Sequence, residues 1–514
     1  MAQGISILQV ILSSICIFGL YLIWFYFTSP LKSIPGPFLA KFTNFWRLID
    51  TYNGRAELTH KFLHEKYGQA VRIGPNLVSL NDPDLVRTIY SLKGEFLKSD
   101  FYTVNDSKVG SITIKTVFGI QTNDVHSQML RPVQKLYKMG HILTLEPLVD
   151  NTINNLFRRL DESFVNGPNA GKTCKIDDWM VFFAWDVIGQ VTFSRSMGFL
   201  DAAYDHSGYL DVSNQINDYF GVIGQLPALD HWLAKNPVWP IGPLTVDKAA
   251  AYCAEQSIAR QKGTDSKYID QKDMLDDFLE LKRLNPGMVN DNTVIGYMLV
   301  NILAGADTTS IAIRSIIYFT LKNPRVYKKL QQEIDNANLS LSVAYKDAAK
   351  LPYLEAVVRE SSRCFPGVGL LLERVVPASG LTLPDGTFLP PGTNVGMSAW
   401  TVHQSKKVFG EDAGYFVPER WLRYEDLETQ EEYESRRSAM RSADLSFGAG
   451  KRICLGRNIS ILEIYKLIPS LFLNYDVSLP TDVLLFATLT MTKDFSREPS
   501  KGMESSEFVV CKAK

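Results

Sequence analysis

The most informative stretch of this chain is Phe447-Gly-Ala-Gly-Lys-Arg-Ile-Cys-Leu-Gly456. Its glycines, Gly448 among them, let the backbone come close to something flat or bulky, and its backbone amides can point at the Cys454 sulfur. Arg452 supplies a cation for an anionic group, and Phe447 can cover the sulfur from water. A thiolate bound to an iron porphyrin requires this set of features.

Two nucleotide-binding motifs do not match the same loop. A phosphate-binding loop requires Ser or Thr after its Gly-Lys pair, and Arg452 stands at that position. A dinucleotide-binding fingerprint requires a third glycine where Ile453 stands. A buried cysteine in a glycine-rich turn remains an alternative, and it is the commoner explanation of a lone cysteine.

The composition is that of a globular protein with a large core. The chain has 514 residues, of which 46% are hydrophobic and 21% charged. Its 54 basic and 55 acidic residues leave a net charge of -1, which excludes a global basic field for nucleic acid and an acidic disordered chain. The 6 cysteines contain no C-x-x-C pair, so neither a disulfide framework nor a zinc module is expected.

The N-terminal segment predicts a membrane anchor. Residues 5–27 carry no charge, and a helix of that length spans a bilayer core. A cleaved signal peptide is the alternative, but no basic residue precedes the stretch. Lys32, Lys41 and Arg47 follow it, so the positive-inside rule keeps the rest of the chain in the cytosol.

The remaining chain predicts a stiff hinge followed by one large domain. Residues 28–37 contain Pro35 and Pro37, which restrict the backbone. We expect residues 38–514 to be mainly α with small β-sheets, including a hairpin over residues 70–80 and a second β region over residues 381–397. We interpret residues 424–444, which are charged and weakly patterned, as a surface meander.

Residues 292–321 predict a long central helix. Its polar residues would be expensive in lipid, which favours a buried helix over a second membrane span. Gly305 offers bare backbone to a heme or dioxygen, and the Thr308 hydroxyl can bond back to the Ala304 carbonyl. Asp307 and Thr308 form an acid–alcohol pair able to pass protons into a dry site. A bent core helix with a satisfied aspartate is the alternative.

With these motifs the chain resembles the cytochrome P-450 superfamily of heme-thiolate monooxygenases. Residues 447–456 match F-x-x-G-x-R-x-C-x-G and residues 304–308 match A-G-x-D-T, both in full. Residues 360–363 match E-x-x-R, and residues 418–421 match the P-E-R-W/F segment. The resemblance implies the superfamily's fold, a single large helical heme domain, here preceded by one N-terminal transmembrane helix.

The resemblance also implies roles for individual residues. Cys454 becomes the axial ligand of the iron in heme b (iron protoporphyrin IX), and Asp307 and Thr308 guide protons to iron-bound oxygen. A buried, structural network is expected from Glu360, Arg363 and Arg420. The residues expected at the cofactor are Cys454, Arg452, Phe447, Gly448, Arg374, His126, Arg131, Ala304 and Gly305.

One motif departs from the family pattern. The helix that carries W/H-x-x-x-R in the family begins at His126 here, but position 130 is Leu and the arginine is Arg131. Either the register shifts by one residue or His126 alone contacts a heme propionate. Arg374 stands where the family often places a propionate-binding arginine.

The function implied by the resemblance is oxidation of a lipophilic small molecule with O2 and NADPH. Electrons would come from an NADPH–cytochrome reductase, with cytochrome b5 as a further partner, at the endoplasmic reticulum membrane with a cytosolic catalytic domain. Residues 54–76 look like the fungal pisatin-demethylase-like branch, which implies secondary metabolism of terpenoids, polyketides or alkaloids. By analogy, residues 101–120, the helix around Asn301 and Ala304, and residues 368–371 line the pocket. A heme-thiolate isomerase or dehydratase without O2 and a non-catalytic membrane heme sensor are the alternatives.

Overall fold

Helices make up most of the computed structural model, which describes residues 19–20, 24, 26–109, 112–242, 246–265, 271–479 and 509–512. Its α-helices are α2 (Phe45–Tyr52), α3 (Ala56–Tyr67), α4 (Val86–Ile89), α5 (Asn123–Val133), α6 (Met139–Ile142), α7 (Glu146–Leu160), α8 (Ile176–Phe193), α9 (Phe199–Ala202), α10 (Tyr209–Ile223), α11 (Val246–Lys262), α12 (Met274–Leu284), α13 (Asp291–Lys322), α14 (Pro324–Asn336), α15 (Tyr345–Ala348), α16 (Pro352–Cys364), α17 (Ala399–Val402), α18 (Lys406–Phe409), α19 (Gln430–Ala443) and α20 (Arg457–Asn474). The predicted anchor over residues 5–27 lies mainly outside the described residues.

The strands are short and form one sheet of five strands and three two-stranded ribbons. They are β1 (Ala70–Gly74), β2 (Leu77–Leu80), β3 (Leu97–Lys98), β4 (Ser107–Val109), β5 (Ile112–Ile114), β6 (Arg374–Val375), β7 (Leu381–Thr382), β8 (Phe388–Leu389), β9 (Asn394–Gly396), β10 (Tyr475–Ser478) and β11 (Val509–Lys512). The predicted hairpin and the second β region are both confirmed. The fold is therefore mainly helical with small sheets, as expected.

The long helix α13 lies at the centre of the helical half. Its start is capped by Asn290, whose side chain accepts a hydrogen bond from the Thr293 N–H at 2.9 Å. Among the described residues, α13 is the one helix long and apolar enough to cross a membrane. Of its most apolar stretch, 56% is buried in the protein. Because it packs against α8, α16 and α20, it is the buried core helix that the sequence predicted.

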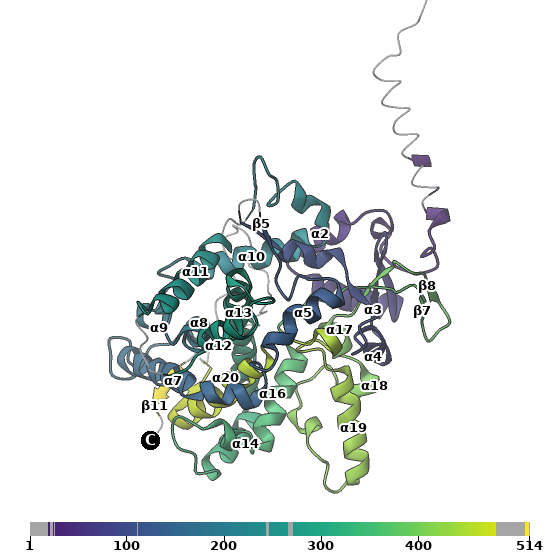
Figure 1. Ribbon diagram of the computed structural model, residues 1–514. Coiled ribbons are helices and arrows are strands. Elements are labelled where there is room, and N and C mark those ends of the chain that lie inside the picture. Colours follow the sequence, from purple (N-terminus) through teal and green to yellow (C-terminus); the bar gives the residue numbers. More distant parts are fainter. Residues whose placement is uncertain are drawn as a thin grey trace, which may run out of the picture.

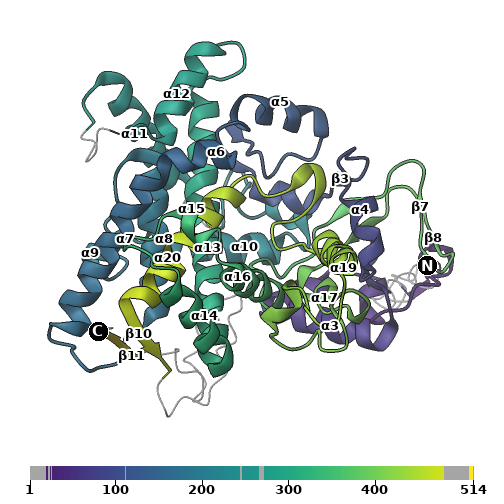
Figure 2. The ribbon, with the colours of Figure 1, turned by 90° about the horizontal axis from the view of Figure 1, so that it is seen from below.

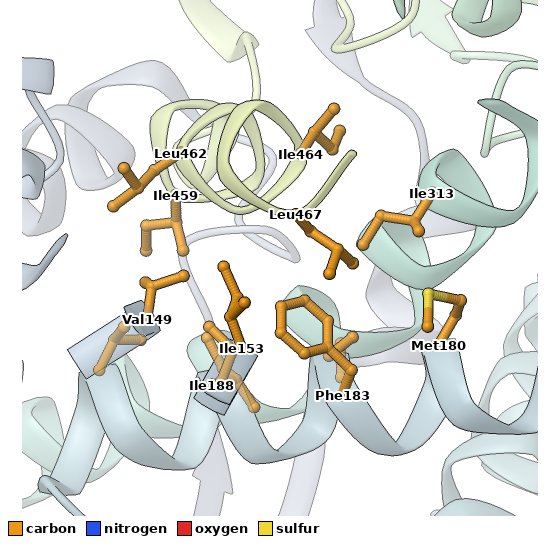
Figure 3. Close-up of a cluster of buried hydrophobic side chains, with 14 of the residues drawn as sticks. Val149, Ile153, Met180, Phe183, Ile188, Ile313, Ile459, Leu462, Ile464 and Leu467 are labelled. Carbon is orange, nitrogen blue, oxygen red and sulfur yellow. The ribbon is translucent and has the colours of Figure 1, made fainter. Parts of the chain in front are cut away.

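The main core lies between α7, α8, α13 and α20. Figure 3 shows side chains of these helices pointing toward one another, including Ile153, Phe183, Ile313 and Leu467, which are fully buried. Both ribbon views place these helices on one side of the molecule and α3, β7 and β8 on the other (Figure 1 and Figure 2). Close packing of this kind fixes α13 and α20 relative to each other.

The five-stranded sheet brings two basic residues together. Its order is β1-β2-β9-β6-β3, so strands far apart in the sequence become neighbours. In the antiparallel pair of β3 and β6, Lys98 stands opposite Arg374. Directly opposed like charges destabilise a sheet, so this pairing requires an explanation from its surroundings.

The segment predicted as a hinge packs against this part of the fold. Leu31 and Ile34 are buried in the second hydrophobic cluster. The Arg72 N–H donates to the Pro35 oxygen at 2.7 Å, and a Cβ on Gly36 would lie 2.1 Å from the Arg72 oxygen. Residues 31–36 are thus attached to the edge strand β1.

The predicted surface meander over residues 424–444 is wrong in part, because α19 (Gln430–Ala443) occupies most of it. Thr429 and Glu432 form a capping box at its start, a local signal that the weak apolar pattern obscured. Met440 and Ala443 are buried in the second hydrophobic cluster. A few buried residues are sufficient to hold a helix that is polar elsewhere.

Candidate active site

The loop before α20 wraps tightly around Cys454. The Cys454 N–H donates to the Phe447 oxygen at 2.8 Å, which closes the loop on itself. Gly450 has a φ of 63°, and a Cβ at that position would lie 1.8 Å from the Tyr90 oxygen. Glycine is therefore required at position 450 by both the backbone conformation and the close approach of Tyr90.

The Cys454 thiol is accessible, and its pKa is shifted by its surroundings. The side chain is exposed to solvent, yet burial is the largest influence on the thiol pKa and raises it. The Gly456 and Arg457 amides lower the same pKa by hydrogen bonding to the sulfur, as predicted from the glycine-rich loop. These amides begin α20, whose N-terminus favours a thiolate.

A strip of α13 is exposed in the middle of an otherwise buried helix. Ala304 and Thr308, one turn apart, are exposed, whereas Ala306 and Thr309 are buried. The Thr308 hydroxyl donates to the Ala304 oxygen at 2.8 Å, which confirms the predicted bond. The exposed strip presents the Thr308 side chain at an accessible surface of α13, as a proton-passing site requires.

Tyr137 links this helix to the cysteine loop. Its hydroxyl donates to Asn301 Oδ1 on α13 at 2.6 Å, and its carbonyl accepts from Asn458 Nδ2 at the start of α20 at 2.7 Å. Burial, followed by weaker interactions that include Cys454, raises the pKa of the Tyr137 hydroxyl. Cys454 and the exposed part of α13 are thus held on neighbouring elements.

The structure gives a different reason for Gly305 than the one expected. A Cβ at this position would lie 2.8 Å from Cδ1 of Ile188 on α8. The missing side chain therefore lets α13 pack closely on α8. The bare side of Gly305 faces Ile188, and not a heme or dioxygen as the sequence suggested. Ala304 and Thr308 present the accessible surface of this turn.

Asp307 is held by three donors from two other helices. Trp185 Nε1 on α8 donates to Oδ1 at 3.2 Å. On α10, Ser213 Oγ and Asn217 Nδ2 donate to Oδ2 at 2.5 and 3.1 Å. Burial raises the pKa of the Asp307 carboxyl, and these hydrogen bonds oppose that rise. The acid is therefore satisfied and oriented, and its pKa lies above the ordinary value.

Four basic side chains form a second feature, which we call the cationic cluster: Lys98, His126, Arg374 and Arg452. Burial, followed by repulsion from Arg374 and Arg452, holds the pKa of Lys98 well below its ordinary value. Burial, then Arg374, lowers the pKa of Arg452 to about 10. Burial lowers the pKa of His126 to about 4, with Arg452 and Lys98 adding to the effect.

No carboxylate of the described chain forms an ion pair with Lys98, Arg374 or Arg452. Lys98 Nζ donates to the Phe118 oxygen at 2.6 Å, and Arg374 Nη1 donates to Tyr102 Oη at 3.2 Å. The Nδ1 atom of His126 is buried without a hydrogen-bond partner. Buried positive charge without counter-charge is costly, so the cluster is suited to anionic groups, which the described residues do not supply.

Arg452 is used differently from the other members. Its Nη1 donates to the Ile120 oxygen at 2.8 Å, and its Nη2 donates to the Gln121 oxygen at 2.9 Å. Its terminal nitrogens thus fasten the segment that leads into α5. Arg452 contributes positive charge to the cluster and places His126, which lies in the first turn of α5.

The structure separates Arg131 from His126. His126 is buried, whereas Arg131 is exposed. Five residues correspond to about 140° around an α-helix, so the two side chains leave α5 on different faces. The alternative with His126 alone at the cluster agrees with this geometry. The shifted register with Arg131 does not.

The residues present fit a heme. A heme carries two propionates, and Lys98, His126 and Arg374 offer buried donors that pair with no carboxylate of the described residues. Cys454 offers an accessible sulfur, with amide donors, on a neighbouring element. Anion-binding groups and a thiolate ligand are the two sets of contacts that a heme-thiolate site requires.

The expected structural network is present and fully buried. Glu360 accepts two hydrogen bonds from Arg363 and one from Arg420 Nε, each at 2.8 Å. Trp421 Nε1 and the Val417 N–H also donate to it at 2.9 Å. Arg420 belongs to the short helix η7 (Pro418–Trp421), so the network joins η7 to α16.

His403 continues this network toward the cysteine loop. It is fully buried, and its Nε2 accepts a hydrogen bond from the Leu445 N–H at 2.9 Å. Its Nδ1 lies 3.2 Å from the Arg363 oxygen. Burial lowers the pKa of the His403 imidazole, with weaker opposing effects from its neighbours. The loop that carries Cys454 is therefore supported from α16.

The comparisons with known proteins identify the class. The cytochrome P-450 family profile matches residues 34–503, so the chain belongs to the cytochrome P-450 family. It is 39% identical to the cytochrome P-450 monooxygenase cfoH of Aspergillus candidus, over 89% of this chain and 86% of the relative. It is 37% identical to the monooxygenase cicH of Emericella nidulans, over 90% of this chain and 92% of the relative.

The monooxygenase mpaDE of Penicillium brevicompactum is a longer relative. The chain is 37% identical to it over 90% of its own length but only 54% of the relative. These fungal relatives support a monooxygenase role, and membership of the family implies heme iron and the use of O2. The assignment to the pisatin-demethylase-like branch stays a prediction.

Sequence reasoning missed several residues of the site. Lys98 was absent from the expected heme contacts, although its place opposite Arg374 marks it in the structure. Trp185, Ser213 and Asn217, which hold Asp307, were also missed. No local motif contains these residues, because each contact joins segments distant in the sequence. The conspicuous acid on an apolar helix was the signal that partners should exist.

Proposed function

We propose that the protein is a heme-thiolate monooxygenase that oxidises a lipophilic small molecule. One molecule of O2, two electrons from NADPH and two protons yield one hydroxylated product and one water. The observation that carries the proposal is the pairing of an accessible Cys454 sulfur with a buried cationic cluster that lacks its own counter-charge.

Different residues would bind the iron, hold the propionates and transfer protons. The Cys454 thiolate would bind the iron, and Lys98, His126 and Arg374 would hold the propionates. When bound, heme supplies an iron centre that activates O2 for insertion into an unreactive C–H bond. Asp307 takes protons from solvent and passes them to the Thr308 side of α13, while the apolar walls exclude water.

Apolar side chains around the site support a lipophilic substrate. The rings of Phe101 and Phe118 pack on Phe220 of α10, with centroid separations of 4.8 and 5.8 Å. Leu370 lies against Gly221 of the same helix. The fungal relatives support secondary metabolism as the setting, with a terpenoid, polyketide or alkaloid scaffold as the substrate class.

The proposal includes a membrane location. Large apolar side chains are exposed on two segments near α2 and α10, which pack against each other. They are Phe38, Leu39, Phe45, Ile49, Tyr52, Trp232, Val238, Trp239 and Ile241. An exposed apolar surface of this kind suits the interface of a bilayer. It supports residence on the endoplasmic reticulum membrane through the anchor over residues 5–27.

A separate basic surface supports an acidic redox partner. Arg131, Lys135, Lys138 and Arg457 are exposed near the start of α20. Asn458 ties this region to the segment after α5 by its bond to the Tyr137 oxygen. An NADPH–cytochrome reductase, with cytochrome b5 as a second donor, would deliver electrons here.

Isotopically labelled dioxygen tests the proposal. The full-length protein is reconstituted with a reductase and NADPH and is given candidate terpenoid, polyketide and alkaloid scaffolds. We expect a product that carries one labelled oxygen atom. An unlabelled rearranged product formed without NADPH would establish the isomerase or dehydratase. Heme binding without any turnover would favour the sensor.

A further inference from the structure

The helix α10 connects two parts of the site that the proposed function treats separately. Ser213 and Asn217 lie one turn apart on one face and hold Oδ2 of Asp307. Two turns beyond Ser213, Gly221 lies against Leu370, at 3.7 Å for an added Cβ. One continuous face of α10 therefore contacts the proton-carrying acid at one end and the pocket wall at the other.

The far end of α10 is packed tightly on aromatic rings. Phe220 contacts Phe101 and Phe118. A Cβ on Gly224, just after the helix, would lie 2.6 Å from Cε2 of Phe101, a buried ring. A substrate that presses on Phe101 or Phe118 therefore presses on α10, because there is no free space between them.

The two oxygens of Asp307 are held by elements of different kinds. Oδ1 accepts from Trp185 on α8, which packs along α13 in the core. Among the described residues, the hydrogen bonds to Oδ2 come from α10, with Ser213 as the shorter bond at 2.5 Å. A small displacement of α10 would therefore release one oxygen while the other stayed fixed.

The charged surroundings of Asp307 do not compensate for such a release. Arg314, farther along α13, lowers the pKa of Asp307 weakly and is paired with Asp177 of α8 at 3.2 Å. From α8 and α10, the groups that act on the carboxyl are the neutral donors Trp185, Ser213 and Asn217. The hydrogen bonds from α10 thus have a direct effect on the protonation of the acid.

We propose that Ser213 and Asn217 are positioning residues through which α10 couples the seating of substrate to the proton supply at Asp307. The inference rests on the proposed function, in which Asp307 carries protons. With α10 seated, its two donors orient the carboxyl and hold it able to release its proton. With α10 displaced, Oδ2 loses the hydrogen bonds that lower the pKa of Asp307. Burial then raises this pKa further, so Asp307 becomes a weaker acid.

The titration of Asp307 tests the hydrogen bonds directly. Infrared spectra of the holoenzyme follow its carboxyl stretch against pH, with Asp307→Asn as the subtracted reference. We expect the pKa of Asp307 to rise in the Ser213→Ala/Asn217→Ala double variant, because two groups that lower it are removed. Gln215→Ala is the matched control, since Gln215 is exposed on α10 and bonds to Asp211. An unchanged or lowered pKa in the double variant would overturn the proposal.

The coupling along α10 has its own test, which leaves the Asp307 contacts intact. Gly224→Ala must displace the end of α10, because the added Cβ would lie 2.6 Å from the backbone oxygen of Phe220 as well as from Cε2 of Phe101. Gly221→Ala makes only an ordinary contact with Leu370. We expect Gly224→Ala to raise the pKa of Asp307 and Gly221→Ala to leave it unchanged. Equal titrations in the two variants would show that α10 does not transmit its position to the acid.

A third measurement separates this inference from the proposed function. NADPH-driven O2 consumption is followed against pH in the reductase-reconstituted holoenzyme. We expect Asp307→Asn to lower the rate of O2 consumption about 100-fold. In the double variant, the high-pH fall of the rate should move to higher pH, together with the pKa of Asp307. Wild-type consumption in Asp307→Asn would refute the proton role alone. If Asp307→Asn is slow but the rate–pH profile of the double variant matches the wild-type profile, the positioning role would be refuted.

Discussion

The network around Glu360 and the cationic cluster both bury charged side chains, but they are completed differently. Glu360 receives five hydrogen bonds, four of them from Arg363, Arg420 and Trp421 side chains, and is fully buried. In the cluster, Lys98 and Arg374 are also buried, yet no carboxylate of the described chain pairs with either. The network is closed by the fold, whereas the cluster has no counter-charge among the described residues.

This difference separates structural charge from binding charge. A closed network loses stability when one member is removed, because the remaining charges stay buried without a partner. An open cluster should behave in the opposite way in the absence of its ligand, because removing a member relieves repulsion. The same kind of substitution therefore reports which role a buried charge has.

The largest effect is expected from Glu360→Ala. Two buried guanidinium groups would lose their shared carboxylate, so the free energy of unfolding should fall by about 3–5 kcal/mol. Chemical denaturation of the holoenzyme measures it. Glu411→Ala is the control, since its pair with Lys406 is exposed and should contribute less than about 1 kcal/mol. Similar losses in both variants would contradict a closed network.

A smaller effect, of opposite kind, is expected from Arg374→Met. Loss of a charge-assisted bond to a propionate should speed heme transfer to an excess of apomyoglobin by about ten-fold or more. Heme-depleted Arg374→Met should be at least as stable as the wild type. Arg131→Met, at an exposed position of α5, should release heme at the wild-type rate. Faster heme release from Arg131→Met would restore the shifted register.

The pH dependence of the heme-free protein sharpens the comparison further. The pKa of His126 is about 4 in the folded state, against an ordinary value of about 6.5. Between these values the unfolded state binds more protons, so stability should rise with pH from about 4 to 6.5. His126→Gln should flatten this rise in denaturation curves. An equally steep rise in the variant would place the titrating group elsewhere.

The smallest effect is expected at α19, which belongs to neither group of charges. Thr429→Ala removes one half of the capping box and should cost about 1 kcal/mol of stability. Heme release should be unaffected. An increase in heme release as large as that of Arg374→Met would mean that general destabilisation, and not the cluster, controls heme retention.

The sequence predicted elements whose signals are local. The helix over residues 292–321 and the hairpin over residues 70–80 were recognised from their own periodicity and turn residues. The bond from Thr308 to Ala304 was recognised because both lie on one turn. The helix α19 was missed, since its pattern is polar and the many charges obscure the capping box at its start.

Contacts between distant segments could not be predicted in the same way. Lys98 reaches the cluster only because β3 pairs with β6. Ser213 reaches Asp307 only because α10 crosses α13. Gly305 was attributed to the cofactor, although its neighbour is Ile188 of α8. A single sequence identifies which residue types are unusual, but the partner that explains them is fixed by packing.

The carbon monoxide difference spectrum of the reduced protein tests the central claim most directly. It is measured on the wild type and on Cys454→Ala, with heme content determined in parallel. The account predicts a strongly red-shifted Soret band in the wild type that disappears in the variant, because a thiolate ligand is required for it. The same band in Cys454→Ala, or a folded wild type that binds no heme, would contradict the assignment of Cys454 as the iron ligand.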